Sequence, residues 1–272
     1  RIADMAATMR QIDQMMRIPA RETVSEAPVR RHFQGRITLD RVSFRYPGTS
    51  QAAIAGISLD IKAGEFIAVM GASGAGKTTL LRLMLDLYRP NAGIVCVDGI
   101  NARQIPNVDL RAAIGYVPQI ITLFHGSIAQ NLRLAAPEAD DHALRRVASE
   151  LGILEAIEAL PQGFDTRIDH ESRDKLPTGF RQVLGIAQAF LRDPQILLLD
   201  EPAQALDPRI EDHFMAAVRR RTGRVTTVMV THRPSHARAA DRILVLDRGQ
   251  IRAFDTPDAI FGAPPEQGGA HG

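Results

Sequence analysis

Apolar residues occur along this chain with several different spacings, and each spacing predicts a different element. Residues 1–20 carry apolar side chains at helical intervals, which predicts an amphipathic helix that ends near Pro19. The charged residues, proline and glycine of 21–35 then predict a linker. In 37–44 and 56–61 apolar and polar residues alternate, as they do in half-buried antiparallel strands.

From residue 65 onward, short apolar strands alternate with helices, which is the pattern of a parallel sheet covered by helices. The stretch 128–160 departs from this pattern, because consecutive helices are predicted there with no strand between them. We therefore expect an inserted helical subdomain at about 120–192. After it the α/β pattern resumes, with strands predicted at 195–200, 225–231 and 242–247. The Gly- and Pro-rich tail 263–272 is expected to be disordered.

A glycine-rich stretch between a predicted strand and a predicted helix, Gly71-Ala-Ser-Gly-Ala-Gly-Lys-Thr-Thr79, fits G-x-x-x-x-G-K-[ST]. Glycines let successive backbone N–H groups curl around a polyphosphate, and the helix N-terminus adds positive potential. In such a loop Lys77 reaches the β- and γ-phosphates, and the Thr78 hydroxyl is a ligand of Mg²⁺. A glycine-rich turn before an ordinary helix would have the same local pattern. The expected phosphate-binding residues are Gly71, Ser73, Gly74, Ala75, Gly76, Lys77, Thr78 and Thr79.

Two carboxylates follow the apolar strand predicted at 195–200, about 125 residues after the glycine loop. An acid at the end of a buried strand beside a phosphate loop holds Mg²⁺ in this kind of site, which assigns Asp200 to the metal. Glu201 points elsewhere and is placed to take a proton from an attacking water, an effect worth roughly 10²–10⁴-fold. The alternative is that the pair simply caps the strand in solvent.

Composition adds few constraints. With 272 residues, 45% of them apolar, the chain can bury a sizeable core. Its net charge is +2, and acidic residues interleave with the arginines, so no stripe for nucleic acid stands out. The single cysteine, Cys96, is predicted to be a small buried core residue. No apolar run approaches the roughly 18 residues of a membrane helix. Because the chain opens on Arg1 and not on Met, we expect it to be part of a longer protein, with processing of the N-terminus as the alternative.

Several shorter motifs stand in a fixed order around the two described above: Tyr46, Val117-Pro-Gln119, Ala205-Leu-Asp207 and Thr231-His-Arg233. As a set they resemble the nucleotide-binding domain of an ABC transporter, over about residues 36–262. The resemblance implies an α/β fold with a P-loop ATPase core, in which a mixed sheet has flanking helices and an antiparallel β subdomain. The helical subdomain is then an insertion in that core.

The resemblance also implies a role for each of these residues, with ATP and Mg²⁺ as the ligands. Tyr46 would stack on adenine. Gln119 would contact Mg²⁺ or the attacking water and link the ATP site to a membrane domain. Asp207 would cross a dimer interface, and His232 would hydrogen-bond the γ-phosphate, although a histidine at a strand end can also be purely structural. The implied catalytic residues are Glu201, His232 and Gln119, and the implied metal ligands are Thr78, Gln119 and Asp200.

One family motif is altered here. The signature L-S-G-G-Q opens a helix and binds the γ-phosphate held by the opposite subunit, and the corresponding residues are Leu176-Pro-Thr-Gly-Phe180. The resemblance therefore implies Pro177, Thr178 and Gly179 as nucleotide contacts. Only Leu176 and Gly179 match, and Pro177 lacks both the hydroxyl and the N–H of serine. Proline suits the first turn of a helix, so we expect the helix to form and its phosphate-binding function to be weakened.

Other positions also depart from the family pattern. Ala203 and Gln204 stand where the family usually has Thr and Ser. Glu171 occupies the place of a glutamate loop that meets the membrane domain in exporters, but its neighbours His170 and Arg173 replace the usual glycines.

The opening segment carries a narrower likeness. Residues 10–22 resemble the stretch that joins the last membrane helix to the ATPase in bacterial type I secretion exporters. This likeness implies that 1–35 is a linker helix and connector from a transmembrane domain of the same polypeptide. A helix that packs on the following domain fits the apolar spacing equally well.

The sequence thus predicts an ATPase that drives export of a substrate, such as a protein or peptide, at the cytoplasmic face of the bacterial inner membrane. The expected partner is a second ABC ATPase domain in a homo- or heterodimer, with a periplasmic adaptor and outer-membrane channel if the type I likeness holds, and no nucleic acid. Two alternatives stay open. One is a soluble ABC ATPase that acts on nucleic acid, and the other is an ATP-binding regulatory module with little turnover.

Overall fold

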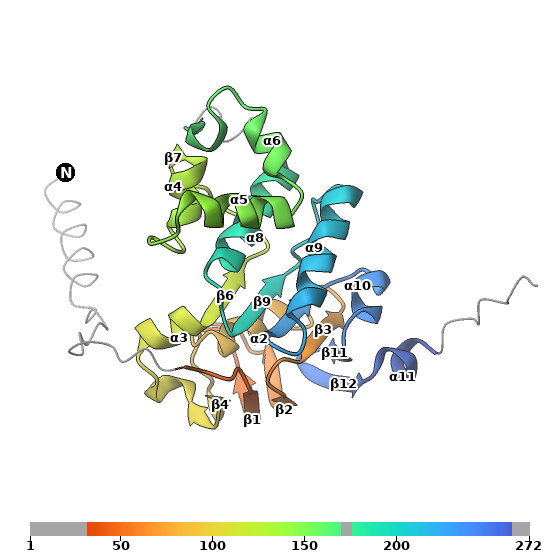
Figure 1. Cartoon of the computed structure of the whole chain (residues 1–272). Coiled ribbons are helices and arrows are strands. Elements are labelled where there is room, and N and C mark those ends of the chain that lie inside the picture. Colours follow the sequence, from red (N-terminus) through yellow and green to blue (C-terminus); the bar gives the residue numbers. More distant parts are fainter. Residues whose placement is uncertain (1–31, 170–175, 263–272) are drawn as a thin grey trace, which may run out of the picture. The chain divides into compact units, whose positions relative to one another are not determined.

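The computed structural model of this chain describes residues 32–169 and 176–262 (Figure 1). The predicted amphipathic helix, most of the predicted linker, Glu171 with its neighbours, and the predicted tail lie outside the described residues.

A four-stranded antiparallel sheet holds the first strands, in the order β2-β1-β4-β5. The strands are β1 (Ile37–Phe44), β2 (Ile54–Ile61), β4 (Ala92–Val97) and β5 (Ile100–Asn101). Strand β1 pairs on both of its edges, because Ile37 lies opposite Ile61 of β2 and opposite Val97 of β4. The alternating pattern of 37–44 and 56–61 therefore predicted their antiparallel pairing correctly.

The chain enters this sheet through a carboxylate clamp. Asp98 accepts backbone N–H groups from Gln34 (2.7 Å), Gly35 (3.1 Å) and Arg36 (2.8 Å). Asp98 lies in the tight turn between β4 and β5 and has a φ of 50°, a left-handed conformation that aspartate tolerates better than most residues. The segment just before β1 is thereby fastened to the turn at the end of β4.

A six-stranded sheet forms the second layer, in the order β12-β11-β3-β10-β9-β6. Its strands are β3 (Phe66–Gly71), β6 (Ile114–Val117), β9 (Ile196–Asp200), β10 (Thr226–Val230), β11 (Arg242–Asp247) and β12 (Gln250–Asp255). The strands β6, β9, β10, β3 and β11 run parallel, and only the edge strand β12 is antiparallel to its neighbour. Both faces of this sheet are covered, which explains the continuous apolar runs in its sequence.

Helices and short turns of helix connect these strands. Beside the sheets lie α2 (Lys77–Met84), η1 (Ala102–Gln104), α3 (Asn107–Ala113), α9 (Pro208–Arg221), α10 (Pro234–Arg238) and α11 (Pro257–Phe261). A separate group of helices lies beyond the ends of β6 and β9 (Figure 1). It contains α4 (Ile128–Arg133), α5 (Asp141–Glu150), α6 (Leu154–Glu158), η2 (Gly163–Asp165), the small ribbon of β7 (Gly126–Ser127) and β8 (Arg167–Ile168), and the long α8 (Thr178–Leu191).

Alternate residues of the central strand β3 face two different cores. Phe66 and Ala68 pack with the helices α4, α5, α8 and α9, whereas Ile67 and Val69 pack with α2 and the antiparallel sheet. All four side chains are 0% exposed. Full burial of a side chain the size of Phe66, Ile67 or Val69 contributes about 1.5–3 kcal/mol. The two cores thus fix β3, and with it the glycine loop that follows.

The fold class predicted from the sequence is confirmed: an α/β fold with a mixed sheet and flanking helices. Three details were wrong. The strand β4 returns to the antiparallel sheet and does not continue a parallel one. The antiparallel edge strand β12 was not predicted. Cys96 is only partly buried, because the neighbouring residues Val95 and Val97 take the core-facing positions of β4 and place the thiol on the opposite face.

Candidate functional site

The glycine loop has the strict backbone requirements of a phosphate cradle. Gly71 has a φ of 151° and Gly76 one of 104°, in the region that disfavours side chains. A Cβ on Gly71 would lie 2.3 Å from the carbonyl oxygen of Leu246, and a Cβ on Gly76 would lie 2.4 Å from that of Ala53. Both positions therefore require glycine, and the loop is fixed between β11 and the end of the turn before β2.

Lys77 begins the helix after the loop, and its side chain turns back into the loop. Its Nζ donates to the carbonyl oxygens of Gly71 (2.8 Å) and Ala72 (2.9 Å). Burial lowers the pKa of the Lys77 ammonium, while the charges of Glu201 and Asp200 act in the opposite direction. An ammonium held inside a curled backbone is suited to a multiply charged anion.

Asp200 ends β9 and is 2% exposed. Burial raises the pKa of its carboxyl group, and the charge of Glu201 adds to this effect, whereas a hydrogen bond from Thr78 and the charges of Arg82 and Lys77 oppose it. A buried carboxylate beside a threonine hydroxyl fits Mg²⁺, which takes one or two carboxylates together with phosphate oxygens and waters. Among the described residues no group of three or more His, Cys, Asp or Glu side chains could hold a metal ion alone.

Glu201 lies between two further side chains that the sequence had singled out. Its Oε2 accepts from Gln119 Nε2 (3.2 Å), and its Oε1 accepts from His232 Nε2 (3.0 Å). The three residues follow β6, β9 and β10, so the parallel sheet brings them together at the carboxyl ends of its strands, where ligands bind in such folds. Glu201 has a φ of 51°, a strained conformation for a residue with a side chain.

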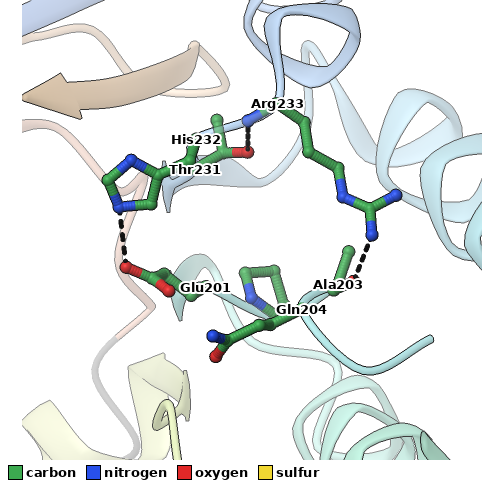
Figure 2. A pocket seen from close by; sticks show the side chains of 7 residues that line it. Glu201, Ala203, Gln204, Thr231, His232 and Arg233 are labelled. Carbon is green, nitrogen blue, oxygen red and sulfur yellow. Dashed lines mark hydrogen bonds and ion pairs between the residues drawn. The ribbon is translucent and has the colours of Figure 1, made fainter.

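A pocket of about 170 Å³ opens beside Glu201. Figure 2 shows Thr231, His232 and Arg233 on one side of it, and Glu201, Ala203 and Gln204 on the other. The side chain of Glu201 is 18% exposed and that of His232 is 53% exposed, so both are within reach of a ligand in solution. The pocket therefore holds a hydrogen-bond acceptor, Glu201, and a donor, His232, and a ligand from solution can reach both.

Tyr46 belongs to an aromatic cluster at the other end of the glycine loop. Its ring meets Phe44 and Tyr88 edge to face, at centroid distances of 5.0 and 5.5 Å. Its hydroxyl lies 2.9 Å from Thr79 Oγ1. Tyr88 in turn accepts a hydrogen bond from Arg82 (3.0 Å). These contacts fix the Tyr46 side chain next to the helix of the glycine loop.

The altered signature lies at the start of α8. Pro177 is the N-cap residue, just before the helix, and forms no side-chain hydrogen bond to it. Gly179 packs so closely on the loop before α9 that a Cβ there would lie 2.4 Å from the carbonyl oxygen of Ala205. Within the described part of the chain, no hydrogen bond joins 177–180 to the glycine loop 71–79. Asp207, in that loop before α9, caps the helix by accepting the N–H of Ile210 (3.0 Å).

Sequence reasoning missed several residues that support the site. Arg82 and Tyr88 were not singled out, yet the Tyr88 ring contacts Tyr46, and Arg82 donates to Tyr88 and carries a charge that lowers the pKa of Asp200. Glu211 and His236 were not singled out, although they meet directly behind the pocket. Their only sequence signal is that two polar residues fall on buried faces of α9 and α10, and this signal becomes visible only with the fold.

Comparisons with known proteins agree with this geometry. The sequence profile described as ABC transporter matches residues 54–204. An ATP-dependent lipid A-core flippase of Chromobacterium violaceum is 37% identical over 238 residues, which is 88% of this chain and 40% of that protein. A β-(1→2)glucan export ATP-binding/permease protein of Rhodopseudomonas palustris is 38% identical over 90% of this chain and 40% of its own length. A solved structure, that of a bacterial Atm1-family ABC exporter with ATP bound, superposes with a TM-score of 0.82 and 32% identity over 95% of this chain and 44% of that one.

The chain belongs to the ABC transporter family. Its relatives further identify it as a nucleotide-binding domain of the exporter type, as the sequence had predicted. The narrower likeness to type I secretion exporters finds no support in these relatives. The chain spans about 40% of the length of the curated relatives it matches, and no helix among the described residues is long and apolar enough to cross a bilayer.

Proposed function

We propose that this chain binds and hydrolyses ATP with Mg²⁺ as the motor domain of an ABC exporter, at the cytoplasmic face of the bacterial inner membrane. The observation that supports this proposal best is the position of Glu201, between Gln119 and His232 and directly after the buried Asp200. A second domain of the same kind and a transmembrane domain would complete the exporter.

In this proposal the glycine loop and Lys77 hold the phosphates, and Tyr46 offers its ring to the adenine. Asp200, Thr78 and Gln119 would hold Mg²⁺, and the bound ion would supply positive charge against the phosphate oxygens. The strained backbone of Glu201 directs its carboxylate into the pocket and away from Asp200. Two adjacent acids thereby take different tasks, one toward the metal and one toward water.

Each carboxylate oxygen of Glu201 accepts one side-chain donor in this structure and keeps a second lone pair for a water molecule. Loss of one donor would leave that oxygen more open to the attacking water. His232 is the more exposed donor, and its Nε2–H can turn from Glu201 to a γ-phosphate oxygen. Nucleotide binding would thus open the base further to water and add a donor to the phosphate in a single movement.

The experiment compares Lys77→Ala with Glu201→Gln. Lys77→Ala should abolish ATP binding, because it removes more than one charge-assisted hydrogen bond, each worth roughly 1.5–3 kcal/mol. Glu201→Gln should bind ATP normally and lower turnover by roughly 10²–10⁴-fold, because the amide cannot take a proton. Binding is measured with a fluorescent ATP analogue and turnover by phosphate release. Equal turnover in wild type and Glu201→Gln would refute the assignment of the base.

The relatives suggest the class of substrate. Their names concern lipid A-core and a glucan, so a lipid- or glycan-containing substrate has more support than the protein or peptide suggested by the opening segment. The same names give no support to a periplasmic adaptor or an outer-membrane channel. Reconstitution of the full-length protein in lipid vesicles, with lipid-linked glycans and unfolded peptides as competing stimulators of hydrolysis, decides between these substrates.

The altered signature favours a heterodimer. In a homodimer both composite sites would lack the serine hydroxyl that Pro177 replaces. With a different partner, Lys77, Asp200, Glu201 and His232 of this chain would meet an intact signature and form the active site. A homodimer that tolerates the change is the alternative, together with a regulatory domain of low turnover. Mass spectrometry of the native complex, purified through a tag on this chain, distinguishes one kind of ABC subunit from two.

A further inference from the structure

A half-buried carboxylate behind the pocket joins two loops of the site. Glu211, in the first turn of α9, accepts from His236 Nε2 through Oε1 (2.6 Å) and from Arg233 Nη1 through Oε2. The side chain of Glu211 is 14% exposed and that of His236 is 3% exposed. Neither residue lines the pocket beside Glu201, so the pair is outside the site described above.

Arg233 extends this link to the turn that follows Glu201. Its Nη2 donates to the carbonyl oxygen of Ala203 (3.2 Å), which also accepts the N–H of Leu206 (3.4 Å). Together with the bond between His232 and Glu201, this contact closes a ring around the pocket, as Figure 2 shows. The loop 231–233 and the turn after Glu201 are therefore fastened to each other at both ends.

The hydrogen bonds of His236 have one consistent direction. Burial lowers the pKa of the His236 imidazole, an effect that the Glu211 carboxylate partly offsets. The neutral ring then donates from Nε2 to Glu211, and its Nδ1 faces the Thr231 hydroxyl at 3.5 Å. That hydroxyl accepts the backbone N–H of Arg233 (3.0 Å). Both ring nitrogens of His236 and both carboxylate oxygens of Glu211 thus have a polar neighbour, which favours a single arrangement.

We propose that Glu211 is a positioning residue, which holds Arg233 on the Ala203 carbonyl and so makes the loop 231–233 and the turn 201–206 move as one unit. Glu201 begins the turn 201–206, and His232 is the middle residue of the loop 231–233. While the bonds of Glu211 and Arg233 are intact, Glu201 and His232 stay within hydrogen-bond distance of each other, and the backbone of Gln204 moves with them. The catalytic consequence rests on the proposed ATPase function, whereas the mechanical link does not.

The test compares Glu211→Gln with a matched control, a carboxylate of α5 that also accepts two donors. The amide keeps one acceptor oxygen, so either Arg233 or His236 loses its acceptor. The control is Glu150→Gln, since Glu150 accepts from Arg221 (2.6 Å) and Arg220 (3.2 Å) with a side chain that is 19% exposed, but joins α5 to α9 away from the pocket. For each variant of the full chain, ATP turnover, the KM for ATP and backbone hydrogen exchange are measured.

Glu211→Gln should lower kcat roughly tenfold or more, because one charge-assisted hydrogen bond is lost. The KM for ATP should stay within about twofold of the wild-type value. Exchange of the amides of Leu206 and His236 should become faster together. Arg233→Met should act on the same bonds and add little to Glu211→Gln in the double variant. Glu150→Gln should change none of these values, although it loses comparable thermal stability.

The proposal is overturned if Glu150→Gln lowers kcat equally, because the effect would then be general destabilisation. It is also overturned if the amides of Leu206 and His236 respond independently to Glu211→Gln. A wild-type chain without turnover would refute the proposed function, but the exchange measurement would still decide whether Glu211 joins the two loops.

Discussion

The substitution Pro177→Ser tests the altered signature directly, because the backbone there already suits a serine. Pro177 has φ −52° and ψ 137° and leaves α8 without a side-chain cap. Ser127, which caps α4 by accepting the N–H of Gln130, has the similar values −77° and 166°. A new cap contributes about 1 kcal/mol to the free energy of unfolding, and loss of the rigid proline from the unfolded chain costs about 0.4–1 kcal/mol. We therefore expect almost unchanged stability.

The effect on turnover should be much larger. In a closed pair of domains the new hydroxyl would donate to a phosphate oxygen, and a hydrogen bond to a charged group is worth roughly 1.5–3 kcal/mol. That range corresponds to about ten- to a hundredfold in the population of the closed state. If the chain works as a homodimer, ATP turnover of the concentrated chain should rise by at least the lower factor, and this gain would overturn the heterodimer, whose main site should barely change. ATP affinity of the dilute chain should stay the same, because the signature serves the site of the opposite copy.

A mixing assay shows whether the serine acts on the other copy. The double variant Pro177→Ser/Lys77→Ala carries the hydroxyl but binds no ATP, so added to wild type it can only supply its signature. Turnover of the mixture should exceed that of wild type alone, whereas Lys77→Ala without the serine should only lower it. Unchanged turnover by Pro177→Ser, in a sample that light scattering shows to be dimeric, would refute the idea that the missing hydroxyl limits hydrolysis.

Three further outcomes are expected. Gly76→Ala should lower the free energy of unfolding, measured by urea titration, by on the order of 2 kcal/mol. The reasons are the φ of 104° at this position and the 2.4 Å distance that a Cβ would have to the Ala53 carbonyl oxygen. Wild-type stability of this variant would contradict the strict need for glycine. Asp207→Ala should cost about 1 kcal/mol in the same assay through loss of the α9 cap, whereas Asp207→Asn, which retains an acceptor, should cost less. His236→Gln should remove a pH dependence, seen as the difference from wild type in thermal melts. In the folded chain the His236 pKa lies below its ordinary value of 6.5, and the charged groups that act on the ring are Glu211, Arg233 and Arg219. The unfolded chain therefore binds more protons, and stability is lost as pH falls below about 6.5. Parallel curves of stability against pH for both proteins would show that His236 does not contribute.

The parts of the fold that the sequence predicted well are those with a strong local cause. The apolar runs of β9 and β10 are buried on both faces, and the glycine loop needs its residues at fixed backbone conformations. In each case neighbouring residues alone carry the information. The parallel strands then bring Gln119, Glu201 and His232 together without any further signal.

The parts that it did not predict depend on distant partners. Residues 92–97 alternate weakly, and only pairing with β1 places Cys96 on the outer face. Glu211 and His236 meet across 25 residues, and an acid in a first helical turn is more often a solvent-exposed dipole partner. The roles of Tyr46, Gln119 and the signature residues came from the resemblance to a family, and they stay predictions until the variants are measured.

The Asp98 clamp at the entrance of the chain determines how this domain responds to force. A pull on the backbone at Gln34 first loads the bonds from Asp98, and then acts along the axis of β1. Because β1 is hydrogen-bonded on both edges, to β2 and β4, its ladder bonds share the load in shear and cannot open one after another like a zipper. Tension applied at this end of the domain is thus distributed over the antiparallel sheet. The sheet then moves as a whole against the core that it shares with the helix of the glycine loop.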